Sequence, residues 1–155
     1  MKLNLGAGDT KLEGFIPIDR KLGTEVYPLT DYADDSVEEI RASHILEHFS
    51  FDEVTKVIAE WVRVLQPGGK IRIAVPDMDK IAEMKDEPTR RFFLMGGQLD
   101  SSDFHRSCFD RKLLQQHMEL CGGLVNIQPW TSDNTDSASH PCSLNLEGIK
   151  PRKET

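Results

Sequence analysis

A single stretch of the chain predicts a strand, a helix and a second strand in succession. The helix is expected in "SFDEVTKVIAEWVRVLQPGG", where apolar residues recur at helical spacing, Ser50 and Glu53 form a capping box, and Pro67 with two glycines ends the pattern. Short apolar runs at Ser36–Ser43 and Ile71–Val75 flank it. Strands joined by such a helix form a right-handed parallel crossover, so we expect these two strands to be parallel neighbours.

The rest of the chain continues this alternation. Five more apolar runs are predicted as strands, at residues 2–5, 14–19, 24–29, 124–128 and 143–150. Shorter helices are expected at 78–85 and at Asp110–Cys121, and the polar stretch 129–141 as an exposed hairpin loop. Seven strands alternating with helices predict an α/β sandwich with a mainly parallel sheet.

The first crossover is unusual. Residues 9–14 are too few for a crossover helix, which takes about ten residues or more. The first helix is therefore expected to be reduced or missing and one face of the sheet thinly covered, so that a partner subunit, as in a homodimer, would complete it.

Length and composition indicate one soluble domain. A chain of 155 residues can bury a core without metal or disulfide staples, and we expect a single domain over 1–155 in which 78–109 can cover a substrate. No apolar run is long enough for a membrane helix, and no signal peptide is expected. Cys108, Cys121 and Cys142 lack metal-type spacing, which favours reduced thiols in a cytoplasmic protein.

The net charge limits the partners. A formal charge of −7 argues against nucleic acid, which is bound mainly through clustered Lys and Arg. It is compatible with small molecules and cationic ligands, although many acidic proteins are simply soluble ones.

A glycine turn follows the first predicted strand in "LNLGAGDTKLEGFIPID". Gly6-Ala7-Gly8 stands where a nucleotide binds in such sheets, yet Lys11 takes the place of the third glycine of a dinucleotide motif. Asp9 would oppose a pyrophosphate and attract a cation. Asp19 can accept hydrogen bonds from both ribose hydroxyls, although it comes earlier than the usual ribose carboxylate. A nucleoside with positive charge is therefore the expected ligand.

The order of these motifs resembles a known family. "LNLGAGD", "GFIPID", "DDSVEEIRASHILEHF" and "EWVRVLQPGGKIRIAVPD" look like successive motifs of small class I S-adenosylmethionine-dependent methyltransferases. "GGQLDSSDFHRSCFD" and "SLNLEGIKP" are similar to C-terminal motifs of compact members that are suspected of acting on sugars or other small metabolites. The resemblance implies a three-layer Rossmann-like sandwich, a seven-stranded sheet with an antiparallel last strand, and S-adenosylmethionine as cofactor.

The resemblance also implies which residues contact the cofactor. They are Gly6, Ala7 and Gly8 at the methionine part, Asp19 and the adjacent Arg20 at the ribose, Leu29 and Thr30 beside the adenine, and Ser43 and His44 beneath the sulfonium.

Methyl transfer chiefly requires alignment, and a hydroxyl acceptor also needs a base. His44 is the first candidate, with a structural role in the strand-to-helix turn as the alternative. His105 lies in a polar, aromatic stretch typical of a substrate loop, where Asp103 could orient it, or the stretch is an ordinary loop. Asp77 could face the acceptor or cap the next helix.

The stretch "HILEH", His44 to His48, matches an inverted zinc-protease signature. That mechanism needs a sustained helix, whereas here the pattern follows a strand and a new cap begins at Ser50. A zinc hydrolase is therefore a remote alternative, and no metal ligand is assigned. The expected function is methyl transfer to a small polar acceptor, a sugar-like hydroxyl or an amine, with a nucleoside-binding module without transfer as the alternative.

Overall fold

The computed structural model, which describes residues 1–152, contains the predicted strand, helix and strand. They are β3 (Val37–Ser43), α1 (Phe51–Val64) and β4 (Leu65–Pro76). β3 and β4 run parallel as neighbours, with Ile40 opposite Ile71. The helix begins as expected, because the carboxylate of Glu53 accepts hydrogen bonds of 2.9 Å from both the backbone N–H and the hydroxyl of Ser50.

The sheet has six strands in the described chain. The other four are β1 (Lys2–Leu5), β2 (Phe15–Ile18), β5 (Val125–Pro129) and β6 (Ser143–Ile149). The order is β2-β1-β3-β4-β6-β5, and β6 is antiparallel to both of its neighbours, which confirms the expected antiparallel last strand.

The predicted strand at 24–29 is absent, so the count of seven was wrong. Its backbone is used in another way: the carbonyl of Val26 accepts the indole N–H of Trp61 at 2.8 Å, and the N–H of Leu29 donates to Glu60 at 2.9 Å. Because side chains of α1 take these backbone groups, the segment packs on the helix instead of pairing with a strand.

Three more helices and three short 3-10 turns complete the chain. They are α2 (Met78–Glu83), α3 (Glu87–Met95), α4 (Arg111–Leu120), η1 (Arg20–Leu22), η2 (Leu46–His48) and η3 (Ser137–Ser139). The helices expected at 78–85 and 110–121 are confirmed, whereas α3 was not predicted. None of its residues is buried, so its apolar pattern is weak, and it depends on Asp86, which caps it through the N–H of Thr89. None of the described helices is long and apolar enough to cross a membrane.

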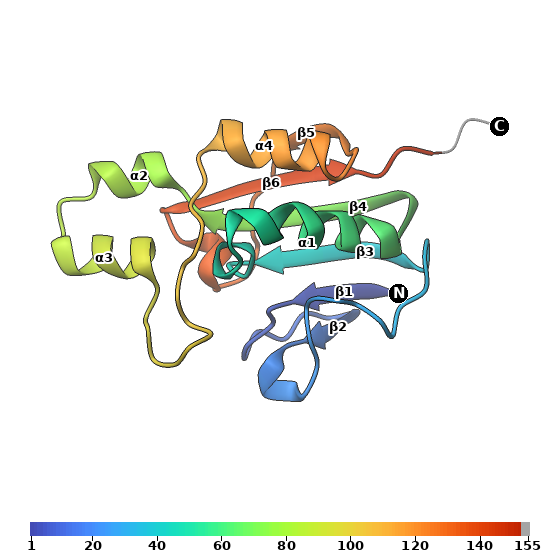
Figure 1. Cartoon of the computed structure of the whole chain (residues 1–155), viewed down its shortest axis with the longest axis horizontal. Coiled ribbons are helices and arrows are strands. Elements are labelled where there is room, and N and C mark those ends of the chain that lie inside the picture. The colour runs from blue at the N-terminus through green and yellow to red at the C-terminus, as the bar shows by residue number, and fades with distance from the viewer. Residues whose placement is uncertain (153–155) are drawn as a thin grey trace.

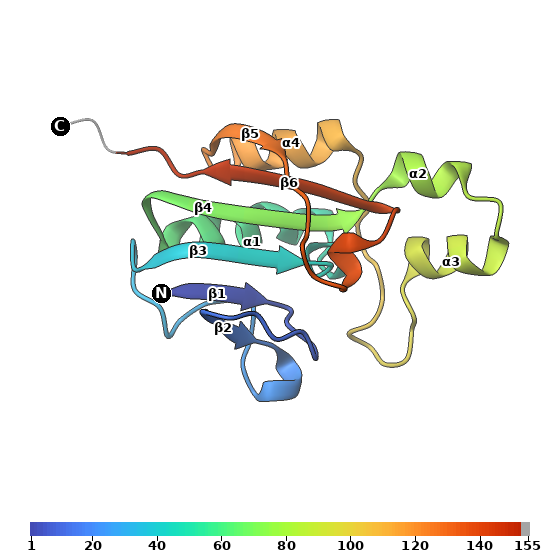
Figure 2. The same cartoon turned by 180° about the vertical axis from the view of Figure 1, so that it is seen from behind.

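Helices cover only one face of the sheet. In Figures 1 and 2, α1 and α4 lie together on one side, while α2 and α3 extend beyond the carboxyl end of β4. The core lies between this face and the helices, and fully buried members include Leu3, Ile40, Trp61 and Ile71. The molecule therefore has two layers where three were expected.

The opposite face of the sheet is polar. Residues that alternate with the core positions carry charge, and ion pairs join four neighbouring strands: Lys2 to Glu39 at 2.9 Å, Glu39 to Arg72 at 3.0 Å, and Arg72 to Glu147 at 3.1 Å. Trp130 lies over Arg72, with 5.8 Å between the guanidinium carbon and the ring centroid. The charged side chains of this face thus pair with one another, and no helix layer covers them in the described structure.

The connection between β5 and β6 crosses this polar face, as Figure 2 shows. Residues 129–141 do form a hairpin connection, but the expectation of an exposed loop was wrong for two of them. Asp136 forms an ion pair with the buried Arg41, and Ala138 is buried. The buried guanidinium therefore anchors the loop to the sheet.

The first crossover contains no helix in the described structure. Residues 6–14 contain only turns between β1 and β2, so the chain crosses without a helix. Because this crossover has no helix, it adds no helical cover to the polar face of the sheet.

Candidate functional site

The glycine turn sits at the carboxyl ends of β1 and β2. The N–H groups of Gly6 and Ala7 both donate to the carbonyl of Ile18, at 2.9 and 3.2 Å, and so tie the two strand ends together. Gly6 has φ +68, and a Cβ at this position would lie 2.8 Å from the Cβ of Ile45. Glycine is therefore required here by both backbone conformation and space.

Asp19 closes the same turn. One carboxylate oxygen accepts the N–H of Gly8 at 2.8 Å, and the other accepts the N–H of Lys21 at 2.9 Å. Each oxygen of an ionised carboxylate can accept more than one hydrogen bond, so both retain capacity for a ligand hydroxyl. The early carboxylate thus reaches the glycine turn across the short crossover.

The surroundings fit a nucleoside cofactor. Gly8 has φ +50 and open space where a Cβ would lie, which leaves its backbone accessible to a ligand. At the neighbouring strand end, the hydroxyl of Ser43 is buried without a hydrogen-bond partner. The Ser43 hydroxyl lacks a partner, the Gly8 backbone is accessible, and the Asp19 carboxylate can accept further hydrogen bonds. A polar ligand bound here would satisfy these groups.

Three other expected cofactor contacts lie in different surroundings. Arg20 is exposed, and its Nε lies 3.6 Å from Glu25. Leu29 is buried and bonded to Glu60, in the second half of α1, so the structure ties it to the helix rather than to the glycine turn. Thr30 is exposed beside it.

A second set of polar side chains gathers where β3 ends, and we call it the histidine cluster: His44, Glu47, His48 and His105. His44 has φ +51 and is mostly buried. Its Nε2 lies 2.9 Å from the hydroxyl of Ser143, which itself donates to Asn145. His44 Nε2 must therefore carry the proton, and its Nδ1 lone pair faces Glu47 Oε1 at 3.5 Å.

Glu47 is the most buried member of the cluster. Its side chain is 1% exposed, and neither carboxylate oxygen has a hydrogen-bond partner. Burial raises the pKa of Glu47 to about 8, while burial, followed by the charge of His105, lowers the pKa of His44 to about 4. Burial therefore favours the neutral form of both side chains.

His48 and His105 lie edge to face, with ring centroids 4.9 Å apart. The Nδ1 of His105 is 2.8 Å from the carbonyl of Phe93. Burial lowers the pKa of both imidazoles. The two rings come from segments far apart in the sequence and meet beside Glu47.

The zinc-hydrolase geometry suggested by "HILEH" is not formed. His44 follows β3, Glu47 and His48 lie in the short turn η2, and α1 begins only at Phe51. His44 and His48 therefore do not share one turn of a sustained helix, which that mechanism requires.

The two aspartates expected near the acceptor have structural contacts. Asp77 caps α2 through the N–H of Asp79 at 3.0 Å, the alternative considered for it. Asp103 accepts the N–H of Leu99 at 3.2 Å, and the partner of His105 Nδ1 is the carbonyl of Phe93. A role of Asp103 in orienting His105 therefore stays a prediction, since the hydrogen bond of this imidazole is with Phe93.

Glu47 and Ser143 were not singled out by sequence reasoning. Glu47 lies within the "HILEH" stretch, and its place between two histidines was a signal of an unusual environment. Ser143, on β6, carries no sequence signal for a contact with His44.

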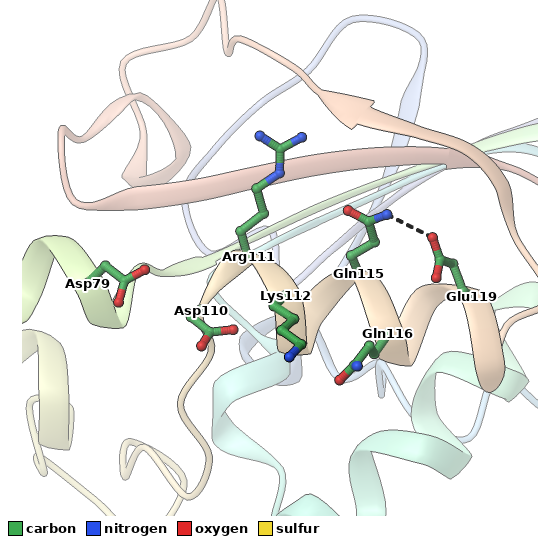
Figure 3. A pocket seen from close by; sticks show the side chains of 7 residues that line it. All are labelled: Asp79, Asp110, Arg111, Lys112, Gln115, Gln116 and Glu119. Carbon is green, nitrogen blue, oxygen red and sulfur yellow. Dashed lines mark hydrogen bonds between the residues drawn. The ribbon is translucent and has the colours of Figure 1, made fainter.

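A surface pocket lies elsewhere, along the exposed side of α4 beside Asp79. It has a volume of about 490 Å³. Figure 3 shows that its polar side chains point in different directions, with Arg111 and Gln116 on opposite sides of the helix. None of the residues that line it is a glycine or a buried titratable group, in contrast to the strand ends.

Comparisons with known proteins identify the fold. A family model described as a methyltransferase domain matches residues 20–73, which contain β3, α1 and most of β4. A SAM-dependent methyltransferase from Archaeoglobus fulgidus superimposes with a TM-score of 0.65 at 13% identity, over 96% of this chain and 85% of that chain. The chain has the fold of class I S-adenosylmethionine-dependent methyltransferases. This confirms the resemblance inferred from the sequence.

Two further structures share this methyltransferase fold. The Haloferax volcanii methyltransferase in complex with the Trm112 activator has a TM-score of 0.62 at 14% identity, over 97% of this chain and 82% of that chain. The Haemonchus contortus phosphoethanolamine N-methyltransferase 2, bound to phosphomonomethylethanolamine and S-adenosylhomocysteine, has a TM-score of 0.58 at 10% identity, over 97% and 49%. A comparison with curated protein sequences finds no match.

Proposed function

We propose that this protein transfers a methyl group from S-adenosylmethionine to a small polar acceptor, a sugar-like hydroxyl or an amine. The observation that carries the proposal is the Asp19 carboxylate, held at the glycine turn by the N–H of Gly8. The methyltransferase fold and the family match to residues 20–73 support it.

The residues at the strand ends would hold the cofactor. The backbone of Gly6, Ala7 and Gly8 would bind its methionine part, Asp19 its ribose, and Ser43 would contact it from β3. The bound cofactor supplies a methyl group on a positively charged sulfur. The task of the protein is then to align the acceptor with that group and exclude water.

For the acceptor proton, we propose His44 or His105, which both lie at the carboxyl edge of the sheet. The segment 78–109, which contains α2 and α3, is proposed to cover the acceptor, because it extends beyond the strand ends (Figure 1) and exposes apolar side chains such as Phe92 and Leu99. Asp77 and Asp103 are proposed to support this segment by accepting the N–H groups of Asp79 and Leu99.

Calorimetry with S-adenosylmethionine and S-adenosylhomocysteine tests the cofactor. We expect binding of one equivalent per chain. Incubation with methyl-labelled cofactor and fractionated metabolites then tests transfer, with the label expected in a small polar compound. The absence of binding by either cofactor at millimolar concentration would refute the proposal.

A binding module without transfer is the second candidate. It is favoured by the open side of Gly8, because the described residues leave this part of the site uncovered. Cofactor binding without labelling of any metabolite would support this candidate, and any labelled product would exclude it.

The uncovered sheet face leads us to propose a homodimer in the cytoplasm, with a small-molecule substrate and no nucleic acid or membrane as partner. The three cysteines are free, in line with a reducing compartment. Light scattering measures the mass directly. A monomer would instead favour a separate protein partner, as in the Haloferax complex with its activator.

A further inference from the structure

Three donor side chains converge in the histidine cluster. Glu47 and His48 come from η2, and His105 comes from the segment between α3 and α4. One ligand atom of each lies within 4.8 Å of the others. The segments are fixed together, because the carbonyl of Glu47 accepts the N–H groups of Arg106 and Ser107, at 2.8 and 3.2 Å.

A hydrogen bond of His105 determines which of its ring nitrogens carries the proton and which has a free lone pair. Its Nδ1 lies 2.8 Å from the carbonyl of Phe93, and a carbonyl only accepts, so Nδ1 carries the proton. Nε2 is then an acceptor, and it lies 3.9 Å from Glu47 Oε1.

His48 contributes the third side chain. Its Nδ1 is buried without a hydrogen-bond partner. In the tautomer with the proton on Nε2, this Nδ1 holds a free lone pair. His48 and His105 can therefore each offer a lone pair to a ligand in the cluster.

Glu47 adds a carboxyl group whose polar atoms are unused. Its side chain is 1% exposed, and both oxygens lack a hydrogen-bond partner. An ionised carboxylate in this position is costly unless it is paired or coordinates a metal. A cation between the carboxyl group and the two imidazole lone pairs would displace the carboxyl proton and turn the same atoms into ligands.

We propose that Glu47, His48 and His105 bind one divalent transition-metal ion. Two imidazoles and one carboxylate are a ligand set for zinc or ferrous iron, whereas magnesium prefers oxygen ligands alone. Groups that hydrogen-bond to the far nitrogens of metal-binding histidines orient the rings, as the carbonyl of Phe93 does for His105. Metal–ligand bonds of about 2.0–2.2 Å require the cluster to contract slightly around the ion.

The site differs from the one suggested by "HILEH". His44 is turned toward Ser143 through Nε2 and lies outside the three-ligand group. When His105 binds the metal its remaining lone pair is used, so His44 is then the candidate for the acceptor proton. Three protein ligands leave a coordination position for water or another small oxygen ligand.

The experiment measures metal bound by the full chain after chelation, dialysis and incubation with Zn²⁺, Fe²⁺ without oxygen, or Mg²⁺. Elemental analysis of the desalted protein is expected to find one equivalent of Zn²⁺ or Fe²⁺ per chain and no Mg²⁺. Substitution with Co²⁺ adds a visible absorption spectrum that reports nitrogen and oxygen ligands.

Variants locate the ion. His105→Ala and the near-isosteric Glu47→Gln are expected to weaken affinity by at least about 100-fold, because loss of even an outer partner costs about 10–100-fold. The matched control is His117→Ala. His117 Nδ1 lies 3.7 Å from Cys121 Sγ, so this variant also tests that pair as an alternative site. Circular dichroism establishes that each variant is folded.

The proposal is overturned if the wild-type protein binds less than about 0.1 equivalent of every metal, well below the one equivalent expected for a single site. It is also overturned if Glu47→Gln and His105→Ala retain metal, or if His117→Ala loses it. The readout is metal content, so it does not depend on methyl transfer or on cofactor binding.

Discussion

The carboxylate of Asp19 accepts a hydrogen bond of 2.8 Å from the backbone N–H of Gly8, eleven positions earlier in the chain. We therefore expect Asp19→Asn to weaken S-adenosylhomocysteine binding by about 10–100-fold, since hydrogen bonds to charged groups contribute about 1.5–3 kcal/mol. Calorimetry measures the change. The control is Asp9→Asn, because Asp9 is exposed beside the same turn. Equal weakening by both variants would contradict a ribose role for Asp19.

Gly6 and Gly8 both have positive φ, but they differ in the space around them. A Cβ on Gly6 would lie 2.8 Å from Ile45, whereas none of the described atoms lies within 4 Å of a Cβ on Gly8. Gly6→Ala is expected to lower the free energy of unfolding by about 2–4 kcal/mol, through overpacking and backbone strain, and Gly8→Ala by about 1 kcal/mol. Urea unfolding compares them, and an equal loss would show that the contact with Ile45 is relaxed.

The ion pair between Arg41 and Asp136 is almost fully buried, with side chains 4% and 10% exposed. Asp136→Ala leaves the guanidinium buried without its partner and is expected to cost about 3–5 kcal/mol of unfolding free energy. The matched control is Asp34→Ala, which removes the 75% exposed partner of Arg63 and should cost at most about 1 kcal/mol. A small effect at Asp136 would mean that the loop 129–141 is not anchored by Arg41.

Acid should weaken the contact between α1 and the segment 24–33. The hydrogen bond from Arg63 lowers the pKa of Glu60 in the folded protein. The stabilisation is therefore present above the unfolded pKa and is lost as pH falls through the lower, folded pKa. The unfolding free energy of wild type should exceed that of Glu60→Gln at neutral pH, and the difference should shrink toward about pH 3. A difference independent of pH would exclude this linkage.

Local signals explain what the sequence predicted well. Ser50 and Glu53 cap α1 within one turn, and Asp19 needs only its position at a strand end to reach the glycine turn. The contacts that were missed join distant residues. Trp61 takes the carbonyl of Val26 from a predicted strand, and His105 meets His48 only because the segment after α3 returns to η2. Neither hydrophobic periodicity nor motif spacing in the sequence predicts contacts between residues so far apart.

The position of β6 has a consequence for how the protein is made. β6 lies between β4 and β5, and among the described strands β5 pairs with β6 alone. While the chain emerges from the ribosome, β4 can pair with β3, but one of its edges and the whole of β5 have no partner until residues 143–149 have emerged. Unpaired strand edges promote aggregation, so the nascent chain is vulnerable in the interval between the emergence of β5 and the emergence of β6.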